Sequence, residues 1–140
     1  MTTKHIVFRM TLQSNPKHIR KVEPFLKKIN HTARLDEIQM HKMMVSLTEA
    51  VNNAIIHGNK SNPEKRVRVR CEVLPGWLAV FVEDEGKGFV PGKVRNPLRK
   101  QNLLRESGRG VFLMRTLMDK VQFEVGPAGA QVSLWLDMNK

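Results

Sequence analysis

Cysteine and long apolar segments are nearly absent from this sequence. Cys71 is the only cysteine among 140 residues, so no disulfide can form within the chain. This excludes a disulfide-stapled scaffold and favours a reducing compartment, so we expect a cytoplasmic protein. No apolar run approaches the roughly 20 residues that cross a bilayer, and the first residues lack the apolar core of a secretory signal. We therefore expect no membrane partner.

Aromatic and acidic residues are also scarce. Tyrosine is missing and aromatics make up 6% of the chain, which weakens the case for a single-strand nucleic-acid binder that stacks bases. Lysine and arginine total 24 against 13 aspartates and glutamates, a formal net charge of +11. This balance favours an anionic partner, whether nucleotide, nucleic acid, lipid or acidic protein. Direct nucleic-acid binding rests on charge alone, so we rank it the least favoured function.

The chain has the size and composition of one globular domain, which we predict to span residues 1–140. Asn15 and Pro16 are a typical helix start, and Gly58 is a typical helix stop. Hydrophobic periodicity predicts the following order: strand 5–12, a helix from Asn15-Pro16, helix 36–57, strands 67–74 and 78–82, helix 110–121, strands 122–125 and 131–138. We expect an α/β (α+β) sandwich, a mixed and mostly antiparallel sheet covered on one face by about three helices.

Glu49 and Asn53 form the first candidate site. They are four residues apart on the predicted helix 36–57, so their side chains share one face. An amide oxygen is a hard neutral ligand that suits Mg²⁺, and a carboxylate can accept a proton from an attacking hydroxyl. For a short motif taken alone, an exposed helical pair with a small stabilising interaction is the commoner explanation.

A second candidate follows the predicted strand 78–82, where residues 83–88 read EDEGKG. Gly86 and Gly88 permit backbone angles closed to other residues and let a ligand approach the main chain. Asp84, at the strand end, can accept a hydrogen bond from an exocyclic amine. A tight acidic turn without a ligand explains the pattern about equally well.

A third candidate opens the predicted helix 110–121, where Gly108, Arg109 and Gly110 follow one another. Backbone N–H groups at a helix N-terminus point outward, at the positive end of the helix dipole, and this arrangement suits phosphate. Arg109 adds a positive charge. A flexible entry into the helix is the alternative explanation.

Taken together, the three candidates resemble the motifs of the GHKL ATPase superfamily, named for gyrase, Hsp90, histidine kinases and MutL. EAVNNAIIHG at 49–58 is similar to its N box, E-x-x-x-N. EDEGKGF at 83–89 is similar to its first glycine box, and ESGRGVFLMRTLMDKV at 106–121 to its second. Within the superfamily, the sequence most resembles the bacterial anti-sigma factor serine/threonine-protein kinases.

This resemblance implies a role for each motif. Asn53 would hold the Mg²⁺ that bridges the ATP phosphates, and Glu49 would be the catalytic base. Asp84 would hydrogen-bond the adenine amino group in a pocket shaped by Gly86 and Gly88. Residues 89–107 would form a lid over ATP. The phosphates would be lined by Gly108, Arg109 and Gly110.

The same resemblance implies partners. The usual substrate in this branch is a serine on a small STAS-type anti-anti-sigma protein, and a sigma factor is the usual partner held inactive. Members of the branch often form homodimers. The chain is therefore expected to transfer phosphate from ATP to a protein serine and to sequester a regulatory partner.

Three departures from the branch keep an alternative open. Gly129-Ala130-Gln131 stands where members commonly have a glycine-threonine pair. The lid region is basic where lids are often acidic in their first part, and the whole chain is unusually basic. The alternative is a non-catalytic module that binds ATP, or has lost it, and acts by occupying a partner.

Other conspicuous residues have simpler explanations. His57 is expected to cap or pack at its helix end rather than act in the chemistry. Cys71 is expected to be a core thiol, and Met40, Met43 and Met44 to fill the core. The arginines at 66, 68 and 70 alternate along a strand, which places them together on a solvated face.

Overall fold

One antiparallel sheet and the helices packed on it make up residues 5–86 and 108–140, the part of the chain that the computed structural model describes. The strands pair in the order β1-β2-β3-β5-β4, and each of these neighbouring pairs is antiparallel. In chain order the elements are β1 (Ile6–Gln13), η1 (Pro16–Lys21), α1 (Val22–Ala33), α2 (Glu37–Asn53), η2 (Ala54–Gly58), β2 (Arg66–Leu74), β3 (Trp77–Asp84), α4 (Gly108–Leu117), β4 (Lys120–Gly126) and β5 (Gly129–Asp137).

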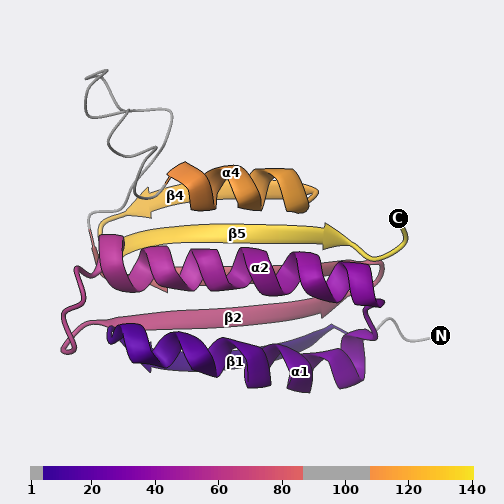
Figure 1. Ribbon diagram of the computed structural model, residues 1–140, viewed down its shortest axis with the longest axis horizontal. Helices are drawn as coiled ribbons and strands as arrows, with labels where there is room; N and C mark the ends of the chain where they lie inside the picture. Colours follow the sequence, from indigo (N-terminus) through magenta and orange to yellow (C-terminus); the bar gives the residue numbers. More distant parts are fainter. Residues whose placement is uncertain (1–4, 87–107) are drawn as a thin grey trace.

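The helices α1, α2 and α4 lie side by side on one face of the sheet (Figure 1). Alternate strand residues face them, so Val67, Val69 and Cys71 of β2 are almost fully buried. Leu26 of α1, Leu47 of α2 and further apolar residues of the three helices complete one continuous core. The predicted sandwich with helices on one face is confirmed.

Local capping signals fix where the first two helical segments begin. The Asn15 side chain accepts a hydrogen bond from the Lys17 N–H, as predicted. The first turn, η1, is a 3-10 helix, and the α-helix proper starts at Val22. Asp36 starts α2 with a capping box, because it accepts from the Gln39 N–H while the Gln39 side chain accepts from the Asp36 N–H.

One predicted helix ends earlier than expected, and the last turn of another is not α-helical. The helix predicted over 36–57 is α-helical only to Asn53, and Ala54–Gly58 forms a π-helical turn. The helix predicted over 110–121 is α4, Gly108–Leu117, and β4 already begins at Lys120. Val121 fits both periodicities, but it pairs with Leu134 of β5. Strand pairing, a tertiary interaction, decides its state.

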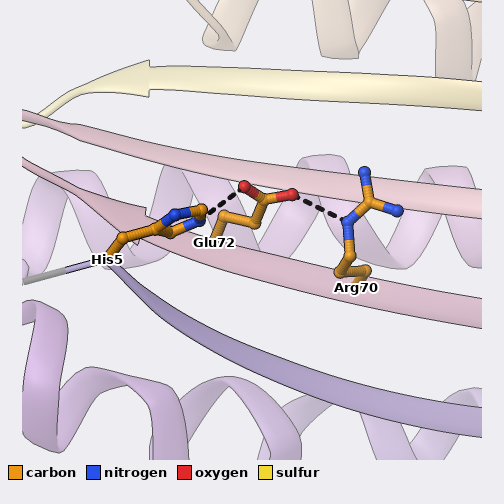
Figure 2. A network of polar contacts seen from close by, with 3 residues as sticks. All are labelled: His5, Arg70 and Glu72. Atoms are coloured by element: carbon orange, nitrogen blue, oxygen red, sulfur yellow. Dashed lines mark hydrogen bonds and ion pairs between the residues drawn. The ribbon is translucent and has the colours of Figure 1, made fainter.

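The opposite face of the sheet carries no helix of the described part and is rich in charge. Arg66 and Arg68 are exposed there, as predicted. The Arg70 guanidinium lies 4.1 Å from the centre of the Phe81 ring, a cation–π contact. Figure 2 shows that Glu72 accepts hydrogen bonds from Arg70 Nε at 2.8 Å and pairs with His5 Nε2 at 2.7 Å. Burial opposes the ionisation of Glu72, but these two partners prevail and lower its pKa.

Burial also settles the remaining predictions for the core. Cys71 is fully buried, and desolvation raises the pKa of its thiol to about 12, which makes it an inert core residue. Met43 is fully buried, and Met40 and Met44 pack partly buried against the core. Among the described helices, none has the length and apolar character needed to cross a membrane.

Candidate functional site

Glu49 and Asn53 lie together in the last turns of α2, facing the start of α4. A Cβ placed on Gly110 would be 2.7 Å from Glu49 Oε2 and 3.4 Å from Asn53 Nδ2. The N-terminal turn of α4 therefore lies directly against the carboxylate and the amide, and only glycine leaves this space open. Both side chains are partly buried rather than exposed. The structure thus brings the first and third sequence candidates together.

Asp84 ends β3, and three glycines crowd around it. A Cβ on Gly58 would overlap the Asp84 carboxylate, and one on Gly129 would overlap the Asp84 backbone carbonyl. Likewise, a Cβ on Gly86 would overlap the Gly58 carbonyl. Gly58 is the last residue of the helical segment, as predicted. It has no left-handed φ, and its structural reason is this close approach to Asp84.

Burial raises the pKa of Asp84 above its usual range, although two backbone N–H groups partly oppose the shift. Those N–H groups belong to Gly86, which donates to Oδ1 at 2.8 Å, and to Ala130. The carboxylate is therefore held in place by the main chain. The absence of a hydroxyl at position 130 leaves this support intact.

Asn59 is a positioning residue for which the sequence patterns predicted no role. Its side chain is almost fully buried. It donates to Ser14 Oγ at 2.8 Å and to the Arg66 carbonyl at 3.0 Å, and its Oδ1 accepts from the Glu85 N–H at 2.8 Å. One amide thus joins β1, β2 and the turn that carries Asp84. In the sequence, the indication of this positioning role is an asparagine directly after Gly58.

One cavity lies between the region of Asn53 and the region of Asp84. Asn53 and Ala50 line it from α2, and Asp84 and Val82 line it from β3. His57 and Gly58 of the π-helical turn also line it, and so do residues of α4 and the β4–β5 pair: Met114, Phe123, Ala130, Gln131 and Val132. His57 was expected to cap or pack. Within the described residues its ring forms no capping hydrogen bond, and the cap of this turn is the Asn59 N–H bonded to the Ala54 carbonyl.

The remaining predicted site residues either do not line the cavity or lie outside the described residues. Gly108 and Arg109 open α4 beside Gly110, and Arg109 is exposed. Gly88 and the lid predicted over 89–107 lie outside the described residues, so their placement stays a prediction.

The donor set next to the cavity suits Mg²⁺ held jointly with phosphates. Asn53 supplies an amide oxygen and Glu49 a carboxylate, both hard donors. The described residues contain no cluster of three or more His, Cys, Asp or Glu side chains that could hold a metal ion by themselves. Mg²⁺ commonly takes only one or two protein ligands and completes its shell with phosphate and water, so a site of this kind fits.

Comparison with known proteins gives an independent view of the chain. The family described as the histidine kinase-like ATPase domain matches residues 12–136. The anti-sigma F factor of Heyndrickxia coagulans is 35% identical over 107 residues, which cover 74% of this chain and 70% of that protein. The serine-protein kinase RsbW of Bacillus licheniformis is 33% identical over 111 residues, which cover 75% and 68%.

A solved structure supports the fold separately. The crystal structure of the RsbU and RsbW domains of a Mycobacterium tuberculosis protein superposes with a TM-score of 0.70 at 16% identity. The match covers 95% of this chain and 32% of that chain, so this protein spans about a third of its length. At this identity the likeness concerns the fold alone.

Proposed function

The chain belongs to the histidine kinase-like ATPase family, and from this premise we propose that it is an ATP-dependent serine protein kinase of the anti-sigma-factor type. Relatives more than 30% identical bear the names anti-sigma F factor and serine-protein kinase. The observation that carries the proposal is that Glu49, Asn53 and the start of α4 lie against one another, and that Asn53 lines the same cavity as Asp84.

The nucleotide lies along this cavity. Asp84 accepts a hydrogen bond from the adenine amino group, which a guanine carbonyl at the same place could not donate. Gly86 and Gly88 shape the base pocket. The phosphates lie at the N-terminal turn of α4, where Gly108, Arg109 and Gly110 offer free N–H groups and a positive charge. Asn53 would hold the Mg²⁺, which would neutralise negative charge on the phosphates.

Glu49 supplies the base. Its carboxylate borders the phosphate end of the site, where it can accept the proton of an acceptor serine hydroxyl. The serine oxygen forms its bond to the terminal phosphorus, the bond from that phosphorus to the leaving ADP oxygen breaks, and the proton moves to Glu49. A protein that only held nucleotide would not need this carboxylate.

The acceptor is a serine on a STAS-type anti-anti-sigma protein, and a sigma factor is the second partner. Both belong to the proposal because the relatives carry anti-sigma names. The protein acts in the cytoplasm, and a homodimer is part of the proposal. The exposed Trp77 on the helix-free sheet face is a surface where a second copy could pack, and light scattering in solution would measure the mass.

A second candidate is the non-catalytic module that occupies a partner. Its motivation is Ala130, where a hydroxyl that is common in the branch is absent, although the Ala130 backbone N–H still supports Asp84. It predicts equal partner binding with and without nucleotide and no phosphate transfer.

The test has two parts. Calorimetry of Mg-ATP beside Mg-GTP should give adenine-selective binding that Asp84→Asn abolishes. Phosphate transfer to a STAS protein encoded beside this one should fall by about 10²- to 10⁴-fold in Glu49→Ala, while Mg-ATP affinity stays within a few-fold. Undiminished transfer in Glu49→Ala would refute the assigned base. ATP binding without any transfer would favour the second candidate.

A further inference from the structure

Four arginines gather on the helix-free face of the sheet, on the neighbouring strands β1 and β2. Arg66, Arg68 and Arg70 alternate along β2, and the strand register places Arg9 of β1 directly opposite Arg70. Residues that alternate along a strand share one face, and the residues between the β2 arginines are buried beneath the helices. These four side chains, called the arginine patch below, therefore lie on the side of the sheet away from α2, which lines the cavity.

The arginine patch carries charge that its described neighbours leave unpaired. Among the ion pairs of the described residues, Arg9, Arg66 and Arg68 take part in none. Glu83 lies opposite Arg68 in the strand register but forms no ion pair with it. Like charges directly opposite each other on neighbouring strands destabilise a sheet, and Arg9 and Arg70 are such a pair. This arrangement costs stability in the free protein, so we expect the anion that offsets it to come from another molecule.

Arg70 is already fixed in a geometry that suits a ligand. Its Nε donates a hydrogen bond to Glu72 at 2.8 Å, and its guanidinium lies 4.1 Å from the centre of the Phe81 ring. Figure 2 shows the two terminal nitrogens of Arg70 directed away from Glu72, so N–H donors remain after this pairing. A guanidinium that is held in this way loses less rotational freedom when it binds an anion.

The spacing of the arginine patch indicates the kind of anion. Alternate residues of a strand recur about every 6.6 Å, so the β2 arginines form a row with that period. An extended peptide with carboxylates at alternate positions has the same period. Each guanidinium can pair with a carboxylate through two parallel N–H···O bonds. The match in period and in bonding geometry favours an acidic, extended protein segment.

Two other occupants fit the arginine patch less well. Single-stranded nucleic acid binds through open aromatic faces on which its bases stack. The Phe81 ring is covered on one side by Arg70 and contacts Trp135 edge to face, with 5.8 Å between the ring centres. A second copy of the chain would place the patch against itself if the two-fold axis passed through it, and like charges would then meet.

We propose that the arginine patch is a docking site for an acidic, extended segment of a partner protein. The segment lies along β2 and places its carboxylates against the guanidinium groups. Docking of this kind is independent of nucleotide binding and of phosphate transfer, because the sheet separates the patch from α2 and the cavity that it lines.

Fluorescence anisotropy tests this docking with the full chain and a short labelled peptide that has glutamate at alternate positions, at about 0.1 M salt. A peptide of the same length with glutamine in place of glutamate is the ligand control and should not bind measurably. In the double variant Arg9→Gln, Arg68→Gln we expect the glutamate peptide to bind about tenfold more weakly, because two charge-assisted contacts are lost.

The double variant Arg20→Gln, Arg34→Gln is the matched control. Both of these arginines are exposed and lie outside the patch, and their loss changes the net charge by the same amount. It should weaken the peptide by no more than about twofold, since distant exposed charges are screened by salt. The melting temperature of the patch variant should not fall, because removal of Arg9 relieves its repulsion with Arg70.

Five results would overturn the docking site. Equal weakening in both double variants would reduce the effect to net charge. Oligouridine that binds more tightly than the peptide and depends on Arg9 and Arg68 would make nucleic acid the occupant. A dimer mass in light scattering that the patch variant loses would assign the face to a second copy. A lower melting temperature of the patch variant would give the arginines a structural role. If the native chain did not bind the glutamate peptide, the docking site would fail while the proposed function stood.

Discussion

At the scale of the residue, Asp84 shows a conflict between function and stability. Its carboxylate is partly buried beside three glycines and carries a raised pKa, because desolvation outweighs the two backbone hydrogen bonds that it accepts. Such a group is poised for a ligand rather than for the stability of the free protein. The nucleotide amine that it would bind supplies the missing partner.

The raised pKa predicts a pH-dependent difference between the native chain and Asp84→Asn. The folded chain holds the Asp84 proton more tightly than the unfolded chain. Ionisation therefore costs stability as the pH rises from the unfolded pKa through the folded pKa. The melting temperature of Asp84→Asn minus that of the native chain, both measured without nucleotide, should increase over this pH interval. At higher pH the difference should keep its increased value.

Differential scanning fluorimetry over a series of acidic to neutral buffers measures this difference. Glu64→Gln removes an exposed carboxylate as the control and should show no such gain. If the melting temperature of Asp84→Asn instead fell relative to that of the native chain as the pH rises, the fold would stabilise the ionised Asp84 carboxylate, and the burial argument would be wrong.

At the scale of the element, the π-helical turn after α2 distinguishes this site from a plain helix end. It directs His57 to the cavity wall and lets Gly58 approach Asp84. Asn59 then ties the turn to β1, β2 and Glu85 through three hydrogen bonds. The helix end and the strand end, which would flank the proposed base pocket, are therefore fixed to each other by one buried amide.

Gly58→Ala tests this contact between elements. The added methyl group would overlap the Asp84 carboxyl group, so the carboxylate would have to move away from the two backbone N–H groups that hold it. We expect Mg-ATP to bind at least tenfold more weakly, and the loss of these hydrogen bonds to lower the free energy of unfolding by about 1 to 3 kcal/mol. Calorimetry and urea denaturation measure the two effects.

Gly126→Ala is the matched control, since a Cβ there would make only ordinary contact, 3.9 Å from the Gly129 carbonyl oxygen. Its ATP affinity should match that of the native chain. ATP binding retained in Gly58→Ala would place the base pocket away from Asp84.

At the scale of the whole molecule, charge and fold act at different ranges. The net charge of +11 attracts any polyanion over a distance set by salt. The cavity, by contrast, has no lysine or arginine in its described wall, and under the proposed function it would select a nucleotide through hydrogen bonds at short range. The net positive charge therefore strengthens binding to anions in general and does not select one anion over another.

Salt should separate these two effects. Duplex DNA binding, where measurable, should weaken by orders of magnitude between about 50 and 200 mM salt, because it rests on counterion release. Mg-ATP affinity should change far less and should stay selective over Mg-GTP. Fluorescence anisotropy with a labelled duplex and calorimetry with the nucleotides measure both. DNA affinity that persists at high salt would contradict the low rank given to nucleic-acid binding.

The sequence by itself determined the fold class, most element positions and the family, because hydrophobic periodicity and capping residues such as Asn15 and Asp36 act locally. The three motifs likewise identified Glu49, Asn53 and Asp84 without coordinates. Their roles remain predictions, and Gly88 and the lid at 89–107 lie outside the described residues.

Only the tertiary structure decided how distant segments meet. Strand pairing ended α4 at Leu117, because Val121 gains a partner in β5 that no local pattern reveals. Packing of β3 against the end of the helical segment made Gly58, its last residue, a contact for Asp84 as well. It also placed His57 in the cavity wall and buried Asn59. Periodicity reports which side of an element is buried, whereas the neighbour that buries it is set by long-range packing.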